Sequence, residues 1–194
     1  MKTMRFALLA AAALFVAACL PVTTKHPVGT TVGFKADPAL LGIWKGRGEE
    51  KDDKDGYITF LNNADSTMTA LVFSPTDDQG EWETYTLQTA TVGGNHIMNA
   101  RAALKNGQPI TGDEANTLFP LLYQIKKGSL TLFILDDDTT KAAIRSGKIQ
   151  GAIDPGDMGD AHITAEPAAL DAFFATKDGA ALFSKKLLTL HRVD

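Results

Sequence analysis

The side chains that could do chemistry in this chain are one cysteine, four histidines and several clusters of acidic residues. His26, His96, His162 and His191 lack the HxH or HxxxH spacing that would place two metal ligands side by side on one element. We expect His162 and His191 in the last two strands, where they could be neighbours. The single cysteine, Cys19, excludes an internal disulfide framework and a site of several thiolates. The sequence therefore predicts no metal site.

No catalytic motif accompanies these residues. The sequence has no Gly-x-Ser-x-Gly nucleophile elbow, no phosphate-binding loop and no glycine pattern of a dinucleotide site. The carboxylate pair Glu49-Glu50 lies between Lys45 and Asp55, where four bases and five acids are mixed, as is typical of a solvated face. We therefore expect a non-enzymatic protein with no catalytic residues and no cofactor.

Two acidic loops carry oxygen ligands that calcium prefers. The run from Asp53 to Ile58 resembles the middle of an EF-hand loop, but Lys51 and Asn62 stand where that loop needs acids. Asp55-Gly56 before a strand is also typical of a hairpin turn. The second loop, 154–160, has carboxylates three residues apart. Calcium binding by either loop stays an alternative to an acidic surface turn.

Cys19 has a more definite role because of what precedes it. Lys2 and Arg5 form a basic head, and Phe6 to Leu20 is an unbroken apolar run that is too short to span a bilayer. The run ends in Val16-Ala17-Ala18-Cys19, which resembles the lipobox of bacterial lipoproteins. This resemblance implies a signal peptide over residues 1–18, cleavage before Cys19, and acylation of Cys19 at the new N-terminus.

The resemblance also implies a location. In Gram-negative lipoproteins a residue other than Asp after the cysteine favours the outer membrane, and here it is Leu20. The expected place is the periplasmic side of that membrane, with acyl chains as the membrane contact. Cleavage removes two of the 19 bases and none of the 23 acids, so the mature chain is more acidic than the net charge of −4. Such a chain disfavours nucleic acid and anionic lipid surfaces. Residues 19–37, rich in Pro, Gly and Thr, are expected to be the lipidated end and a flexible tether.

Residues 38–194 are predicted to form a single, mainly β domain. Apolar runs of strand length, rich in β-branched and aromatic residues, alternate with Gly, Asn and Asp. Gly93-Gly94 and Lys127-Gly128 supply the positive φ of tight hairpins, as Asp55-Gly56 is expected to do. About eight to nine antiparallel strands should form a meander that closes, fully or partly, into a barrel. The expected strands are 40–45, 57–61, 67–73, 82–92, 95–103, 118–125, 129–135, 161–165 and 187–193.

Short helices are expected near the C-terminus. Pro167 is suited to the first position of a helix whose apolar stripe contains Leu170, Phe173 and Phe174. Asp178 is expected to cap a second short helix, and residues 141–146 to form a third after three aspartates. Strand 129–135 is apolar on both faces, so we expect it to be covered on both sides.

A local motif resembles the lipocalins. Gly42-Ile43-Trp44 in the first strand is similar to their Gly-x-Trp signature, and a helix before the last strand matches their order of elements. The resemblance implies that a basic residue near the chain end, here Arg192, stacks over Trp44. It also implies a barrel that holds a small apolar ligand.

The leading functional hypothesis is accordingly a tethered, non-enzymatic envelope module that binds an apolar small molecule or lipid. The alternative is an interaction or structural lipoprotein that contacts another protein through exposed loops at 105–116 and 154–160. Pockets of the first kind lie in the mouths of barrels. The candidate lining residues are Trp44, Phe60, Leu71, Phe73, Tyr85 and Phe133.

Overall fold

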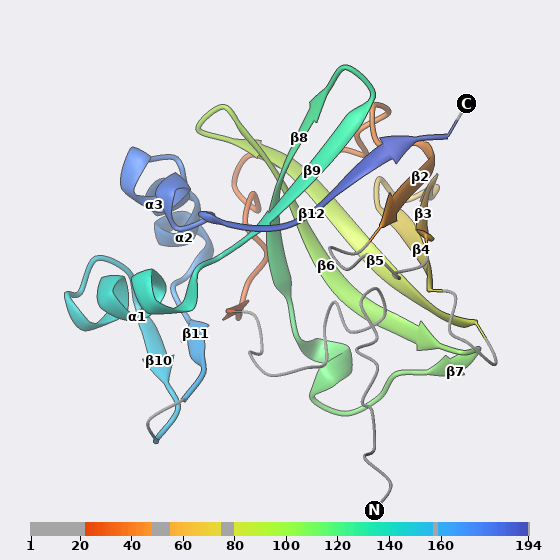
Figure 1. Cartoon of the computed structure of the whole chain (residues 1–194). Helices are drawn as coiled ribbons and strands as arrows, with labels where there is room; N and C mark the ends of the chain where they lie inside the picture. Colours follow the sequence, from red (N-terminus) through yellow and green to blue (C-terminus); the bar gives the residue numbers. More distant parts are fainter. Residues whose placement is uncertain (1–21, 48–54, 75–79, 157–158, 194) are drawn as a thin grey trace, which may run out of the picture.

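Eight antiparallel strands close into a barrel in the computed structural model, which describes residues 22–47, 55–74, 80–156 and 159–193 (Figure 1). The barrel strands are β2 (Gly42–Arg47), β3 (Asp55–Asn62), β4 (Met68–Ser74), β5 (Glu81–Val92), β6 (Asn95–Lys105), β8 (Phe119–Lys126), β9 (Ser129–Ile134) and β12 (Lys185–Arg192). Their order is β5-β4-β3-β2-β12-β9-β8-β6, and β6 pairs with β5 to close the ring. A short extra strand, β7 (Gln108–Pro109), pairs with the end of β6. The predicted mainly β barrel fold is confirmed.

A smaller layer lies against one side of the barrel (Figure 1). It contains a three-stranded sheet and three helices: β1 (Thr23–Thr24), β10 (Gly151–Ile153), β11 (Ala161–Ile163), α1 (Asp137–Arg145), α2 (Pro167–Phe174) and α3 (Lys177–Ala181). β11 is the central strand of this sheet, antiparallel to β10 and parallel to β1. The expected strand 161–165 is therefore real but lies outside the barrel, and β1 and β10 were not predicted.

Two hairpins follow directly from local sequence. Gly93 and Gly94 connect β5 to β6 with φ of 57° and 82°, and Lys127 and Gly128 connect β8 to β9 with φ of 49° and 78°. Both predicted turns are confirmed. The prediction for Asp55-Gly56 is wrong, because both residues already belong to β3 and pair with β2. The connection that precedes them lies outside the described residues.

Strand β9 separates two apolar cores. Leu130 and Leu132 are buried inside the barrel, whereas Leu135 is buried in a second cluster formed with the helices, against which Phe133 packs. The side chains of a strand alternate between its faces, so two apolar faces require cover on both sides. The prediction that this strand is covered on both sides is confirmed.

Trp44 closes one end of the barrel core, where β2 meets β12. Its side chain is fully buried, and its Nε1 donates a hydrogen bond to the Leu40 carbonyl at 2.7 Å. The Arg192 guanidinium carbon lies 4.4 Å from the centre of the Trp44 ring. The same guanidinium donates to the carbonyls of Ala39 and Leu41, both at 2.6 Å. The expected stacking of Arg192 on Trp44 is confirmed.

All three predicted helices are present, and two of them, α1 and α3, start at other residues than predicted. α2 begins at Pro167, as expected. α1 begins at Asp137, earlier than residue 141, because Asp136 caps it by accepting a hydrogen bond from Thr139 N. α3 is capped by Thr176, whose hydroxyl accepts from Gly179 N; Asp178 lies in its first turn instead. In both cases a capping side chain upstream of the predicted start sets the first turn.

The predicted flexible tether is wrong for its described part, residues 22–37. Val22 and Val28 are buried in the core under the helices. Asp171 of α2, a buried carboxylate, accepts hydrogen bonds from Gly29 N at 2.6 Å, Thr31 N at 2.7 Å and the Thr31 hydroxyl at 2.6 Å. These bonds give partners both to the donors of the segment and to the buried carboxylate. The segment therefore packs against the helices although its sequence has no apolar periodicity.

Replacing Trp44 by Ala should destabilise the barrel by about 3–5 kcal/mol, because it removes a fully buried indole and its hydrogen bond. The matched control is Ile43→Ala, since the neighbouring side chain is 46% exposed. Urea midpoints measure both effects. A Trp44 variant as stable as the Ile43 control would contradict the position given to Trp44.

Replacing Asp171 by Ala should release the segment around Gly29 and Thr31. Hydrogen bonds to a charged acceptor contribute about 1.5–3 kcal/mol each, and their loss leaves Gly29 N without its partner in a buried place. Hydrogen exchange of the Gly29 and Thr31 amides should accelerate well above that of the barrel strands. The exposed Asp178→Asn serves as control; unchanged exchange in the Asp171 variant would disprove the role of this carboxylate.

Candidate functional site

The barrel interior contains half of the predicted lining residues. Trp44, Phe60 and Tyr85 are buried in its core. Leu71, Phe73 and Phe133 lie on the outer side of the wall: Leu71 is half-buried, Phe73 is 39% exposed, and Phe133 packs against the helical cluster. The residues of β4 that line the interior are Ala70 and Val72. They alternate with Leu71 and Phe73 along the strand and therefore lie on its other face.

A residual cavity of about 40 Å³ remains inside the barrel. It is lined by Ile58, Phe60, Ala70, Val72, Tyr85, Leu87, Met98, Ala100, Leu121, Leu132, Leu187 and Leu188. Ligand pockets commonly measure about 300–1,000 Å³, so the interior as it stands is mainly a packed core. Leu187 and Leu188 are half-buried, and the pairing of β12 with β2 covers only His191 and Arg192. The cavity therefore adjoins the part of β12 that has no ladder partner on β2.

Two tyrosines place polar atoms in this core, and both are satisfied. The Tyr85 hydroxyl donates to Glu83, and the Tyr123 hydroxyl donates to Asp37 at 2.7 Å. The pKa of each phenol lies well above its ordinary value. Burial is the larger cause, and the adjacent carboxylate raises the pKa further. Glu83 in turn pairs with Lys105 at 3.1 Å. Because these groups bond to each other, the cavity wall stays apolar.

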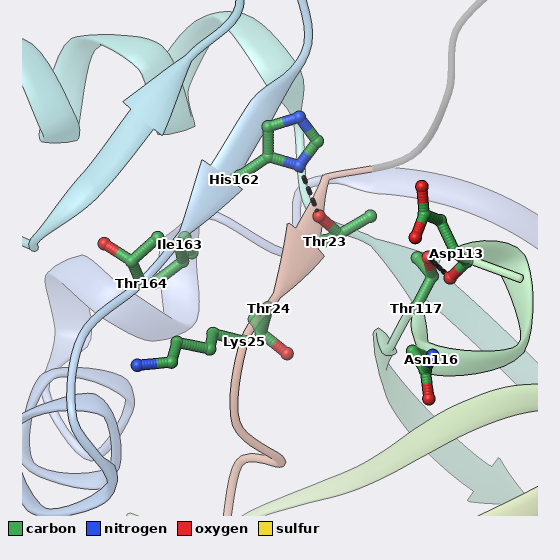
Figure 2. A pocket seen from close by; sticks show the side chains of 9 residues that line it. All are labelled: Thr23, Thr24, Lys25, Asp113, Asn116, Thr117, His162, Ile163 and Thr164. Carbon is green, nitrogen blue, oxygen red and sulfur yellow. Dashed lines mark hydrogen bonds between the residues drawn. The ribbon is translucent and has the colours of Figure 1, made fainter.

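A second, polar pocket of about 260 Å³ lies between the small sheet and the turn before β8 (Figure 2). That turn contains a single 3-10 turn, η2 (Glu114–Asn116). The pocket lining is rich in hydroxyl groups and consists of Thr23, Thr24, Lys25, Asp113, Asn116, Thr117, His162, Ile163 and Thr164. No single element supplies these residues, so the pocket depends on the packing of β1 between β11 and the barrel.

His162 is fixed between two oxygen atoms at the edge of this polar pocket. Its Nδ1 lies 2.6 Å from the Thr23 hydroxyl, and its Nε2 lies 3.2 Å from an Asp154 carboxylate oxygen. A neutral ring that donates from Nε2 to Asp154 and accepts at Nδ1 from Thr23 satisfies both contacts. The parallel pairing of β1 with β11 places Thr23 opposite His162.

Thr24 differs from the other hydroxyls of the pocket. The residue is 4% exposed, and its Oγ1 has no hydrogen-bond partner within the described part of the chain. Its backbone N–H donates to the Leu118 carbonyl at 3.1 Å, which bridges the small sheet to the barrel. A buried hydroxyl without a partner costs free energy, so this position is unusual in a packed protein.

The chemistry of the polar pocket is that of hydrogen bonding. Thr23, His162 and Asp154 are connected like a nucleophile, base and acid, but the neighbouring backbone N–H groups of Thr24 and Lys25 are already bonded to Leu118 and Ile163. They are therefore not free to stabilise an oxyanion. Among the described residues, no group of three His, Cys, Asp or Glu side chains could hold a metal ion.

The histidines and the acidic loops considered for metal binding have other partners where the structure describes them. His191 lies on β12, where its Nδ1 is 3.0 Å from the Ser129 hydroxyl, so the expectation that it neighbours His162 on adjacent strands is wrong. In the EF-hand-like run, Asp55 pairs with Lys45 at 2.7 Å, while Asp53 and Lys54 lie outside the described residues. In loop 154–160, Asp154 turns to His162, and residues 157–158 lie outside the described part.

Sequence reasoning missed the polar pocket because it assigned Thr23, Thr24 and Lys25 to the tether. The β-branched run Val22-Thr23-Thr24 is the one local signal of a strand there. One end of each loop proposed to contact a partner, 105–116 and 154–160, borders the pocket: Asp113 and Asn116 line it, and Asp154 contacts the lining residue His162.

Comparison with known proteins gives no relative: no family model, curated protein or solved structure matches the chain. No helix among the described residues is long and apolar enough to cross a bilayer. Cys19, the predicted lipidation site, and the predicted signal peptide over 1–18 lie outside the described residues.

Proposed function

We propose that this chain is a lipid-anchored protein of the bacterial envelope, on the periplasmic side of the outer membrane. Its non-enzymatic barrel domain binds an apolar small molecule or an acyl chain. The anchor rests on the basic head, the short apolar run and the Val-Ala-Ala-Cys motif at Cys19. The ligand class rests on one observation: a cavity with wholly apolar walls beside an incompletely paired strand, β12.

The size of the cavity constrains the ligand. About 40 Å³ is room for a few carbon atoms, so a larger ligand must displace side chains of the core. Met98 is suited to such movement because its side chain is unbranched and adaptable. Entry past the half-buried Leu187 and Leu188 would admit the end of a slim chain first. A narrow alkyl terminus fits these limits better than a fused ring.

The second candidate function is contact with another envelope protein through loops 105–116 and 154–160. It is favoured by the polar pocket, because one end of each loop borders it: Asp113 and Asn116 line it, and Asp154 contacts the lining residue His162. Native mass spectrometry of the acyl-free domain separates the two functions. Lipid that copurifies supports the barrel as the site, whereas an unliganded mass together with a partner captured through the loops supports contact.

Filling the cavity should abolish uptake of an apolar probe. Ala100→Val adds two methyl groups at a lining position where a β-branched residue suits the strand. We expect wild-type protein to enhance the fluorescence of cis-parinaric acid and the Ala100 variant to do so at least about tenfold more weakly. Thr86→Val, at an exposed position of β5, is the control. Equal enhancement by all three proteins, or none by wild type, would reject the barrel as the site.

The anchor predicts that Cys19 carries the label when cells are grown with radioactive palmitate. Acyl chains on this residue are expected to hold the mature protein in the membrane fraction, because each buried methylene contributes about 0.8 kcal/mol. Cys19→Ala should lose the label and yield either a soluble protein or an unprocessed precursor. An unlabelled wild type, or a processed Cys19 variant that stays with the membrane, would refute acylation. A membrane-bound precursor is compatible with it.

A further inference from the structure

We propose that one particular face of the domain is held against the bilayer, and that this face fits a surface of zwitterionic headgroups. We name it the N-terminal face, because it surrounds the point where the chain enters the domain. The proposal rests on the acyl anchor at Cys19 proposed above. It adds the orientation of the domain and the kind of lipid surface that the domain meets. The face is defined by Thr23, Asp113, Asn116, Thr117, Asp154 and His162.

The packing of the first described residues leaves a very short link to the anchor. Val22 is buried in the core under the helices, and Thr24 N donates to the Leu118 carbonyl at 3.1 Å. Two residues separate Val22 from Cys19 in the sequence. The Cα atoms of Cys19 and Val22 are therefore at most about 11 Å apart. A flexible tether over residues 19–37 would have allowed a separation of up to about 60 Å.

This short link determines which face meets the bilayer. A domain that hangs from acyl chains lies on one side of the bilayer, so the surface around Val22 must be the surface next to the headgroups. Figure 2 shows Thr23 between His162 on one side and the turn that carries Asp113 on the other. In Figure 1 the β8–β9 hairpin projects at the top, whereas β1 and the turn before β8 lie lower. The N-terminal face is thus turned to the headgroups and the β8–β9 hairpin away from them.

The charges at the N-terminal face determine the kind of lipid surface. Asp113 and its neighbour Glu114 are exposed, and neither belongs to an ion pair in the described part of the chain. The cation that follows Thr24, Lys25, already lies 3.5 Å from Glu166. The face is therefore negative, and anionic headgroups repel it. The Debye length at physiological salt is about 8 Å, so charges held by so short a link still sense this repulsion.

A bilayer rich in phosphatidylethanolamine fits these conditions. Its headgroups carry no net charge, so the repulsion is absent. Their ammonium groups can donate charge-assisted hydrogen bonds to the carboxylates of Asp113 and Glu114. The short link keeps these partners at a high effective concentration, so contacts that are weak one by one suffice.

The full chain, coupled through Cys19 to a maleimide-bearing phospholipid in phosphatidylethanolamine nanodiscs, tests the orientation. Cys19 is the single cysteine, so the coupling is unique, and its outcome does not depend on whether cells acylate this residue. A gadolinium chelate on some headgroups broadens the amide signals of nearby residues. We expect the signals of 23–25 and 113–117 to be lost and those of 127–128 to remain. Any other distribution, including no loss, would overturn the orientation.

Ten Gly and Ser residues inserted after Leu20 test the link as the cause. The insertion extends the reach by up to about 35 Å and leaves the packing of Val22 unchanged. The signals of 113–117 should then return. The same ten residues inserted after Val193 are the control and should leave the losses as they were. If the insertion after Leu20 also leaves them unchanged, the short link does not orient the domain.

The lipid class is tested by replacing phosphatidylethanolamine with phosphatidylglycerol at low salt, where screening is weak. Repulsion should restore part of the signal of 113–117 relative to 23–25. The double variant Asp113→Asn, Glu114→Gln should keep the losses in both lipids. The control Asp178→Asn, which removes an exposed carboxylate from α3, should respond as the unchanged chain does. Losses at 113–117 that are equal or stronger in phosphatidylglycerol would refute the zwitterionic surface.

Discussion

The buried carboxylate of Asp171 is the contact on which the arrangement outside the barrel depends. It sits on α2 and holds the backbone and hydroxyl of a segment 140 residues earlier in the chain. Without a counter-charge nearby, a carboxylate is stable in the interior only when several donors point at it. Gly29 supplies one donor at a position where φ is 103° and a Cβ would collide with Ala90. Asn99 of β6 completes the attachment by bonding both the N–H and the carbonyl of Val28 at 2.8 Å.

This attachment explains how the polar pocket exists at all. Shortly before the fixed residues Val28 and Gly29, the chain pairs with β11 and bridges to Leu118. The resulting two-residue strand, β1, places Thr23 on His162 and buries Thr24 beside the turn of η2. The pocket is therefore a consequence of docking the N-terminal segment, and the barrel contributes a rigid wall to it.

The parts of the fold that were predictable are those encoded over short distances. The Gly93-Gly94 and Lys127-Gly128 turns, the two apolar faces of strand 129–135 and the order of strand, helix and last strand are all visible within a few residues. The tether was misjudged because its partners are remote: Thr23 bonds a residue 139 positions away. Composition rich in Pro, Gly and Thr indicates only that a segment has no regular periodicity, and it carries no information about such partners.

The candidate site shows a different limit. Leu71 and Phe73 were predicted to line the barrel, yet the positions of β4 that line the cavity hold the smaller residues Ala70 and Val72. Both faces of this strand carry apolar residues, so the alternation of side chains alone could not decide which face points into the barrel. The small side chains are needed there because Trp44, Phe60 and Tyr85 already occupy the interior. The packing of the interior thus determines which face of β4 points into the barrel, and the same packing reduces the cavity to about 40 Å³. A barrel filled in this way shapes and supports its outer surface, where the docked segment leaves the larger, polar pocket.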